Sequence, residues 1–284
     1  MNRIMKICLW IAIPMIVAGG IVASVSFLMG ARGWRDAADA DNTAKVSEIL
    51  SGRLDSFKLD INYGEVHIVE GPELKVEAEG VSDRFSWKLE NGTLTVKEKG
   101  SFNSGFYLFG KYIGDKLNEK RVITITLPKG TKLKELDIDV GAGYVEFAGM
   151  TADKADIDIG AGSMEADELT VTGKCRLSAG TGSIAVTEIT AEKLYLETGV
   201  GSIEAGAQTD GDISIDCGVG GITLTLQDSE DSYNYKFDSG VGGVTIGESD
   251  YSGLGKNKNI DNGAGKTISI ECGVGNVEVL FERN

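Results

Sequence analysis

The stretch LDIDVGAGYVEF, residues 136–147, decides the fold of this chain. A Gly-x-Gly between two apolar runs first suggests a dinucleotide-binding loop, but the third glycine of that fingerprint would fall on Glu146. The same phrase returns six more times along the chain, whereas a nucleotide site needs only one such loop. The repetition therefore indicates a structural bend and not a phosphate cradle.

The seven copies are regularly spaced. Their first glycines lie 19, 20, 19, 19, 22 and 33 residues apart, and such sustained self-similarity is typical of stacked repeat folds. The paired glycines, which we expect to permit positive φ and close backbone approach at a corner, are Gly141, Gly143, Gly160, Gly162, Gly180, Gly182, Gly199, Gly201, Gly218, Gly220, Gly240, Gly242, Gly273 and Gly275.

Each copy alternates apolar and polar residues with a period of two, which is the pattern of a strand. In the first copy Ile138 and Val140 would face one way, and Asp137 and Asp139 the other. One unit is then two short strands, a glycine corner and a polar return. Stacking these units predicts an all-β fold, a single β-solenoid with coils of about 19–20 residues and apolar side chains inside.

The N-terminus carries a long apolar run. Residues 7–31 contain no charged residue, and about 20 apolar residues span a bilayer core. A cleaved signal peptide is the alternative, but its apolar core would be shorter and no A-x-A cleavage site follows the run. The sequence therefore predicts a single-pass transmembrane helix with the rest of the chain outside the cytoplasm. The resulting segments are a cytoplasmic tail (1–6), the anchor (7–31), a juxtamembrane linker (32–53) and a β-solenoid ectodomain (54–284), divided into irregular N-terminal coils with a cap (54–130) and regular repeats (131–284).

The less regular segments carry their own signals. Asn91-Gly92 between two alternating runs predicts a tight hairpin. Residues 42–52 are the only part of the ectodomain side expected to reach a few helical turns. The long spacings come from insertions at 227–236 and 247–266, which we expect to be surface loops.

The order of these segments resembles a known family. FKLDINYGEVHIVEG (57–71), GTLTVKEK (92–99) and VITITLPKG (122–130), followed by the GAGYVEF-type units, resemble the bacterial "putative adhesin" family of β-strand-repeat proteins, a domain of unknown function. The resemblance covers residues 54–284. It implies a right-handed β-solenoid in the cell envelope, often membrane-anchored, with some relatives linked to envelope stress and to antimicrobial peptides. It implies no catalytic residues.

Charge restricts the partners. From residue 36 onward the chain carries all 43 acidic residues and 24 of the 28 basic ones, a net charge of −19. Such a surface repels phosphate backbones, so we expect no nucleic acid partner. It also repels anionic lipid, so the N-terminal helix alone would hold the protein to the membrane. Cationic peptides, protein partners and envelope glycans remain compatible with it.

Carboxylates recur two positions before the first glycine of most copies. Stacked about 4.8 Å apart on one outer face, they would repel one another, and a calcium ion between them would relieve the repulsion. A solvated acidic face is the alternative. This candidate calcium ladder comprises Asp139, Asp158, Glu197, Asp216, Asp238 and Glu271. No other cofactor is expected.

Catalytic signals are weak. His67 is the single histidine of the chain, and it should face outward between Val66 and Ile68. Cys175, Cys217 and Cys272 fall on the inward phase, where free cysteine behaves as a small apolar residue. If the coils stack in sequence order, the last two lie two layers apart, about 9.6 Å, which is beyond the reach of a disulfide.

An aromatic excursion interrupts the strands at 101–120. It could cap one end of the solenoid, or it could present an exposed loop to a partner. In the second case the candidate partner-binding residues are Phe106, Tyr107, Phe109 and Tyr112.

The sequence thus predicts a non-enzymatic, membrane-anchored β-solenoid that acts as an adhesin or interaction module of the cell envelope. Two alternatives remain open. One is an envelope-stress component that captures cationic peptides, and the other is a carbohydrate-active β-helix enzyme.

Overall fold

The computed structural model describes residues 44–82, 84–98, 106–108, 111–113, 121–251 and 253–282. The chain divides into two units, and the larger one holds residues 43–100 and 119–284. Of the smaller unit, the structure describes one antiparallel hairpin, β6 (Phe106–Leu108) with β7 (Lys111–Ile113). The anchor predicted over 7–31 lies outside the described residues, and within them no helix has the length and apolar character that crossing a bilayer requires.

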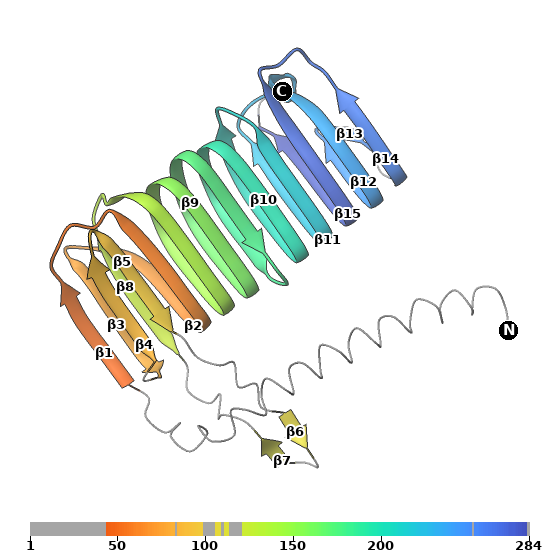
Figure 1. Ribbon diagram of the computed structural model, residues 1–284. Helices are drawn as coiled ribbons and strands as arrows, with labels where there is room; N and C mark the ends of the chain where they lie inside the picture. Colours follow the sequence, from red (N-terminus) through yellow and green to blue (C-terminus); the bar gives the residue numbers. More distant parts are fainter. Residues whose placement is uncertain are drawn as a thin grey trace. The chain divides into compact units, whose positions relative to one another are not determined.

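The larger unit is all-β and is built around one 13-stranded sheet. Its central strands pair in parallel, each continuing through a bend, so that successive coils lie side by side (Figure 1). The prediction of an all-β, solenoid-like fold is confirmed. In spatial order the central strands are β2 (Ser56–Gly71), β9 (Lys132–Ala179), β10 (Ser183–Thr209), β11 (Ile213–Leu226), β15 (Lys266–Phe281) and β12 (Tyr233–Ile246).

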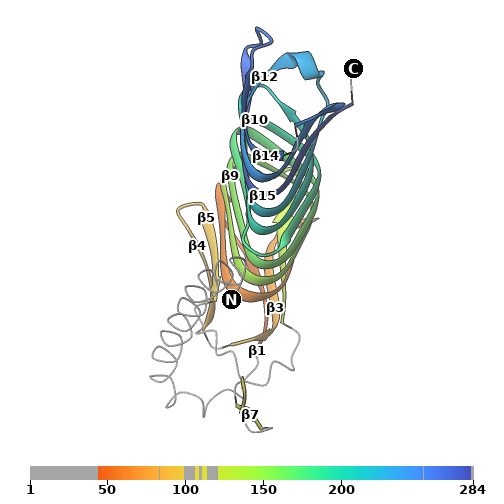
Figure 2. The same cartoon turned by 90° about the vertical axis from the view of Figure 1, so that its right-hand side faces the viewer.

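The core lies between the two walls that each bent coil forms. Viewed along the stack, every coil is a narrow loop with its glycine corner at one end (Figure 2). Alternation places Ile213, Ile215 and Cys217 inside before the corner of β11, and Ile222 and Leu224 inside after it. The same pattern runs through all coils, so the inward side chains form one continuous apolar cluster.

Backbone contact between coils explains the corner glycines. A β-carbon on Gly143 would lie 1.9 Å from the carbonyl oxygen of Gly64, and one on Gly162 would lie 2.0 Å from that of Gly143. The second glycine of every corner meets the preceding corner in this way, at 1.9–2.2 Å, and the first meets it at 2.5–2.8 Å. Of the fourteen glycines, only Gly143, Gly162 and Gly220 have positive φ. Close stacking therefore requires glycine at all of these corners, whereas positive φ requires it at only three of them.

Shorter strands cover the N-terminal end of the stack, with parallel pairs next to β2 and antiparallel pairs outside them. The first half of β2 pairs with β5 (Thr93–Glu98), and the second half pairs with β8 (Val122–Pro128). Outside these lie β4 (Phe85–Glu90) on β5, β3 (Leu74–Val81) on β8, and β1 (Ala44–Leu50) on β3.

Two local predictions are settled at this end. Asn91 and Gly92 have φ of 50° and 78° between β4 and β5, so the tight hairpin is confirmed. The helical turns expected within 42–52 are wrong, because residues 44–50 form β1 and Val46 and Leu50 pack against the core. Tertiary packing overrides the local helical preference here. The sheet thus begins within the segment predicted as a linker.

The C-terminal coils do not stack in sequence order, and this corrects the prediction. The chain leaves β11, forms β12 two layers further out, and then returns so that β15 lies between them and pairs in parallel with both. The predicted two-layer separation of Cys217 and Cys272 is therefore wrong, since they are register partners on adjacent strands. The insertions are also more ordered than predicted: they include the 3-10 turn η1 (Glu230–Ser232) and the edge strands β13 (Ser249–Asp250) and β14 (Gly253–Ile260), both antiparallel to β12.

A polar cluster fixes the point where the returning chain enters the stack. Lys266, the first residue of β15, donates from Nζ to the carbonyl oxygen of Thr209 at 2.8 Å and to Asp228 Oδ2 at 2.7 Å. The hydroxyl of Tyr233 donates to the same carboxylate at 2.9 Å. These contacts join the ends of β10, β11 and β12 to the start of the inserted strand.

We expect Gly201→Ala to destabilise the fold by about 1–3 kcal/mol, because its β-carbon would lie 2.1 Å from the backbone oxygen of Gly182, which cannot move without separating the coils. Urea unfolding followed by far-UV circular dichroism measures the change. The matched control is Gly265→Ala, where no atom lies within 4 Å of the added carbon. Equal effects of the two substitutions would contradict the steric explanation.

Removing a buried hydroxyl should stabilise the fold, in contrast to Gly201→Ala. Thr198 is 2% exposed, and its Oγ1 has no hydrogen-bond partner among the described residues. We therefore expect Thr198→Val to raise the free energy of unfolding by about 1 kcal/mol, since an unsatisfied buried hydroxyl is replaced by a methyl group of similar size. The exposed Thr190→Val should change it by less than about 0.5 kcal/mol. A loss of stability in Thr198→Val would show that the hydroxyl has a partner in solution.

Candidate functional site

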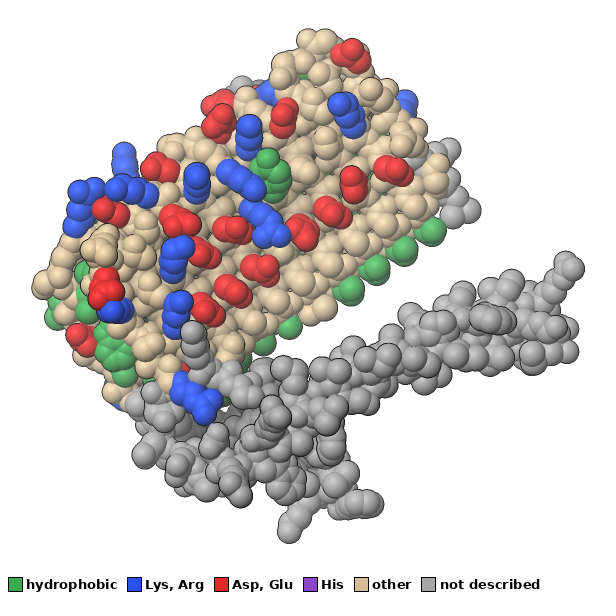
Figure 3. Space-filling model, in the orientation of Figure 1, with side chains coloured by type: hydrophobic (Ala, Val, Ile, Leu, Met, Phe, Trp, Pro, Cys, Tyr) green, Lys and Arg blue, Asp and Glu red, His purple; other side chains and the backbone are tan. Residues whose placement is uncertain are grey.

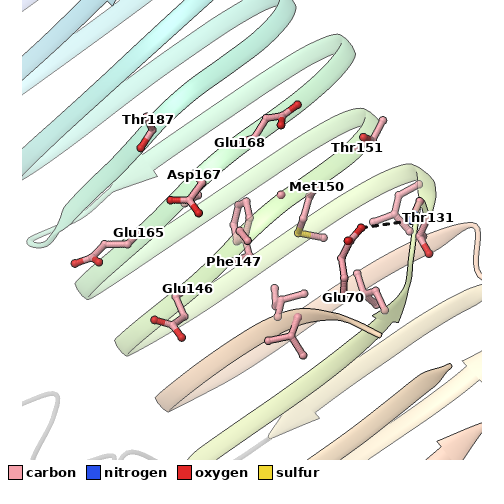
Figure 4. Close-up of a pocket in the computed structure, with 18 of the residues that line it drawn as sticks. Glu70, Thr131, Glu146, Phe147, Met150, Thr151, Glu165, Asp167, Glu168 and Thr187 are labelled. Carbon is pink, nitrogen blue, oxygen red and sulfur yellow. Dashed lines mark hydrogen bonds between the residues drawn. The ribbon is translucent and has the colours of Figure 1, made fainter. Parts of the chain in front are cut away.

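A groove of about 870 Å³ opens on the wall formed by the second halves of the first coils. It is bordered by the ends of β2 and β8, the start of β9, and the segments that follow three successive glycine corners (Figure 4). Its volume lies within the range of roughly 300–1,000 Å³ that is usual for ligand sites. This groove is the candidate functional site.

The groove is acidic. Five carboxylates line it, and its lining includes no lysine or arginine. The apolar part of the lining includes Val69, Pro128, Phe147 and Met150. The site therefore combines negative charge with apolar surface, and its carboxylates are Glu70, Glu146, Glu165, Asp167 and Glu168.

The repeat itself builds this arrangement. Outward residues of successive coils fall in register, so Glu146 and Glu165 occupy equivalent places on neighbouring coils and point the same way in Figure 4. The next residue in that outer row is Ala185, whose short side chain leaves space beside Glu165. Gly149, which has no side chain, borders the same hollow.

A tyrosine hydroxyl bridges two of the groove carboxylates. Tyr144 Oη lies 3.0 Å from Glu146 Oε2 and 3.1 Å from Glu165 Oε2. A phenol has one hydrogen, so it can donate to only one of them at a time. Desolvation, followed by these two hydrogen bonds, raises the pKa of Tyr144 well above its ordinary value. One carboxylate oxygen is consequently left facing the lone pairs of another oxygen, which favours a cation beside it.

His67 lies in the same outer row, on β2. Its Nδ1 is 2.6 Å from Glu146 Oε1 and its Nε2 is 3.1 Å from Glu65 Oε1. Hydrogen bonds from His67 and then from Tyr144 lower the pKa of Glu146. The sequence placed His67 on the outer face, but it gave no sign of Tyr144 joining two coils, because that contact depends on their register.

The predicted calcium ladder forms a row on the other wall, but its order differs from the sequence. Register pairs Glu197 with Asp216, Asp216 with Glu271, and Glu271 with Asp238, so the inserted coil places Glu271 between two earlier residues. Ser178 separates Glu197 from Asp158 and Asp139. Among the residues that the structure describes, no group of three or more His, Cys, Asp or Glu is placed to hold a metal ion.

Basic side chains neutralise part of this wall. Arg176 reaches Asp156 at 3.2 Å and Glu197 at 2.6 Å, each from a different guanidinium nitrogen. Figure 3 shows acidic side chains in rows across the coils, interspersed with lysine and arginine. This wall therefore carries charges of both signs, whereas the charged side chains in the groove lining are all carboxylates.

The candidate partner-binding residues of the aromatic segment belong to the smaller unit. Phe106, Tyr107 and Tyr112 lie on the β6–β7 hairpin, where Tyr107 pairs with Tyr112, and Phe109 is outside the described residues.

One exposed apolar feature was missed from the sequence. Val200, Val219 and Val274 are register partners at the centre of their Gly-x-Gly corners, and Val241 holds the same position on β12. They are 48–55% exposed and form a valine ridge along the corner edge, where Figure 3 shows a line of hydrophobic side chains. The middle residue of the motif was identifiable, but its outward direction depends on the shape of the corner.

The fold and the repeated corner define a class of protein. The chain belongs to the Toastrack DUF4097 family, which matches residues 55–280. Among curated proteins no sequence matches it.

Solved structures of similar proteins carry adhesion in their names. One is a putative cell adhesion protein from Clostridium sporogenes, at 15% identity over 85% of this chain and 100% of that one, with a TM-score of 0.35. Another is a putative adhesin from Bacteroides fragilis, at 16% identity over 84% of this chain and 98% of that one, with a TM-score of 0.42. A third is a putative adhesin from Parabacteroides distasonis, at 10% identity over 84% and 97%, with a TM-score of 0.33.

We expect Asp139→Asn to raise the melting temperature at pH 7 by about 1–2 °C. Burial, then the charges of Asp158 and Asp60, raise the pKa of Asp139. When the pKa of a carboxyl is higher in the folded state than in the unfolded state, the fold loses stability as the pH rises from the unfolded-state pKa through the folded-state pKa. The uncharged amide of asparagine removes this loss. The gain should fade toward pH 3, where the aspartate is protonated in both states.

Differential scanning calorimetry across this pH range measures the effect, with the exposed Asp210→Asn as control. A lower melting temperature for Asp139→Asn in calcium, abolished by chelator, would instead support the calcium ladder.

Proposed function

We propose that this protein is a non-enzymatic, membrane-anchored interaction module of the cell envelope, an adhesin whose acidic groove holds cationic and apolar side chains of a partner. The proposal includes the anchor over residues 7–31 and an ectodomain outside the cytoplasm, as the sequence predicts. Family membership agrees with this role without specifying a ligand.

The observation that carries the proposal is the pair of carboxylates on Tyr144. A single phenolic hydrogen serves Glu146 and Glu165 at nearly equal distances, and no lysine or arginine lies within ion-pair distance of Glu165 among the described residues. An ammonium or guanidinium group placed here would donate to the carboxylate that the phenol leaves without a hydrogen. Charge-assisted hydrogen bonds of this kind are about twice as strong as neutral ones.

The rest of the groove selects an amphipathic partner. Val69 is 42% exposed and Pro128 is also part of the lining, so apolar side chains of a partner can pack next to the charged contacts. The net charge of −19 from residue 36 onward attracts cationic segments and repels nucleic acid and anionic lipid. A basic protein segment fits these features better than a neutral glycan, which gains nothing from the charge.

The second candidate function is capture of soluble cationic peptides as part of an envelope-stress response. The same groove charge favours it. The two functions differ in the partner, which is a surface-attached protein in one case and a free peptide in the other. Retention of whole cells that display the partner, competed by free peptide, separates them.

The experiment uses the full chain in nanodiscs and a 12-residue peptide of alternating lysine and leucine. Fluorescence anisotropy of the labelled peptide measures the dissociation constant of its complex with the protein at about 150 mM salt. We expect the double variant Glu146→Gln/Glu165→Gln to bind the peptide about tenfold more weakly, because it removes the two carboxylates that would pair with the lysines. This factor corresponds to a loss of about 1.4 kcal/mol of binding free energy.

The matched control is Glu204→Gln/Glu278→Gln, which removes two charges from the same outer row but outside the groove. It should change the dissociation constant by less than about twofold, since exposed, screened charges contribute little. Equal weakening in both double variants would reduce the binding to diffuse attraction and contradict the groove as the site. If neither the wild type nor either double variant bound the peptide, the proposal of a cationic, amphipathic partner would be wrong.

A further inference from the structure

The inserted coil brings two cysteines together. Because β15 lies between β11 and β12, Cys272 is the register partner of Cys217 on the adjacent parallel strand. Both side chains point into the core, where Cys217 is 0% exposed and Cys272 is 4% exposed. The third described cysteine, Cys175, lies in a different inward row and pairs in register with Leu194.

The spacing suits a covalent bond. Neighbouring strands lie about 4.8 Å apart, and a disulfide requires α-carbons about 4.4–6.8 Å apart with the side chains on the same side. The two cysteines also occupy the same inward row of the core, so both thiols lie on one side of the sheet.

The neighbours in this row leave room for the sulfur atoms to adjust. Thr198 precedes Cys217 in register, and Ser239 follows Cys272, so small side chains lie on both sides of the pair. In earlier coils the same row contains the larger aliphatic residues Val140 and Ile159. The hydroxyls of Thr198 and Ser239 have no partner among the described residues, so neither holds a sulfur in a fixed hydrogen bond.

We propose that Cys217 and Cys272 are a modification site, at which a disulfide bond fastens the inserted strand β15 to β11. The oxidant is a small or protein disulfide, such as oxidised glutathione. One cysteine thiolate attacks the oxidant, forming a mixed disulfide and releasing one thiol. The second cysteine thiolate then attacks the mixed disulfide, forms the Cys217–Cys272 bond and releases the second thiol. Two electrons and two protons pass from the cysteines to the oxidant.

The bond forms while the stack is still closing. Burial raises the pKa of Cys217 to about 11, and the thiolate is the attacking species, so the folded core protects the pair from exchange. The C-terminal strand must be inserted between two coils that precede it in the chain. A disulfide made as β15 pairs with β11 prevents its withdrawal and also closes the loop that contains β12, β13 and β14.

Thiol counting on the full chain tests the proposal. The sequence has four cysteines. After refolding in oxidised and reduced glutathione, alkylation under denaturing conditions should label two of them, Cys8 and Cys175, and peptide mass mapping should recover a Cys217–Cys272 cross-link. Alkylation of all four, or a cross-link that involves Cys175, would overturn the proposal.

Stability of the same refolded protein provides a second readout that does not require a variant. Dithiothreitol should lower the melting temperature of the wild type by roughly 5–15 °C, as expected for opening a loop of this length in a domain of this size. Cys217→Ser and Cys272→Ser should melt at the lower temperature with or without reductant, while Cys175→Ser should keep the reductant-dependent shift. A wild type whose melting temperature ignores dithiothreitol would contradict the disulfide.

Discussion

Backbone contact at the glycine corners is the constraint on which the rest of the structure depends. Each coil turns so tightly against the one before it that the second corner glycine sits 1.9–2.2 Å, measured from the site of a β-carbon, from a backbone oxygen. This contact holds neighbouring coils at strand spacing at the bend as well as along the walls. The corner also fixes the pairing register of neighbouring coils, because the strand on either side of it starts at the same glycine in every coil. The repeated phrase persists because any side chain there would separate the coils.

The fixed register gives the surface its chemistry. Residues at equal distances from the corner form rows, and this places carboxylates of successive coils beside one another on both walls. On one wall Arg176 forms ion pairs with Glu197 of the row and with Asp156, whereas around Tyr144 the carboxylates converge without a lysine or arginine in the groove lining. The same register brings Cys217 and Cys272 together once the last coil is inserted. Groove and cysteine pair are thus two consequences of one stacking rule.

Much of this follows from the sequence, and the failures have physical causes. Period-two alternation such as that of Ile138 and Val140 predicts which residues are inside, and the repeated glycines predict the stacked coils. The order of the coils does not follow, because every copy of the repeat fits every other and local pattern cannot choose a neighbour. This ambiguity explains the wrong separation assigned to Cys217 and Cys272. The bridge at Tyr144 escaped prediction for a similar reason, since it joins two coils across their register.

The most direct test of corner stacking is the position of three glycines in a crystal structure of the protein. The account predicts that the α-carbons of Gly220 and Gly275 lie about 4.8 Å apart, that Gly242 lies about the same distance beyond Gly275, and that no side chain could fit between them. Gly242 lying directly beside Gly220 would show that the coils stack in sequence order. Corners spaced widely enough for a β-carbon would show that the glycines serve some other purpose, and either result would contradict the account.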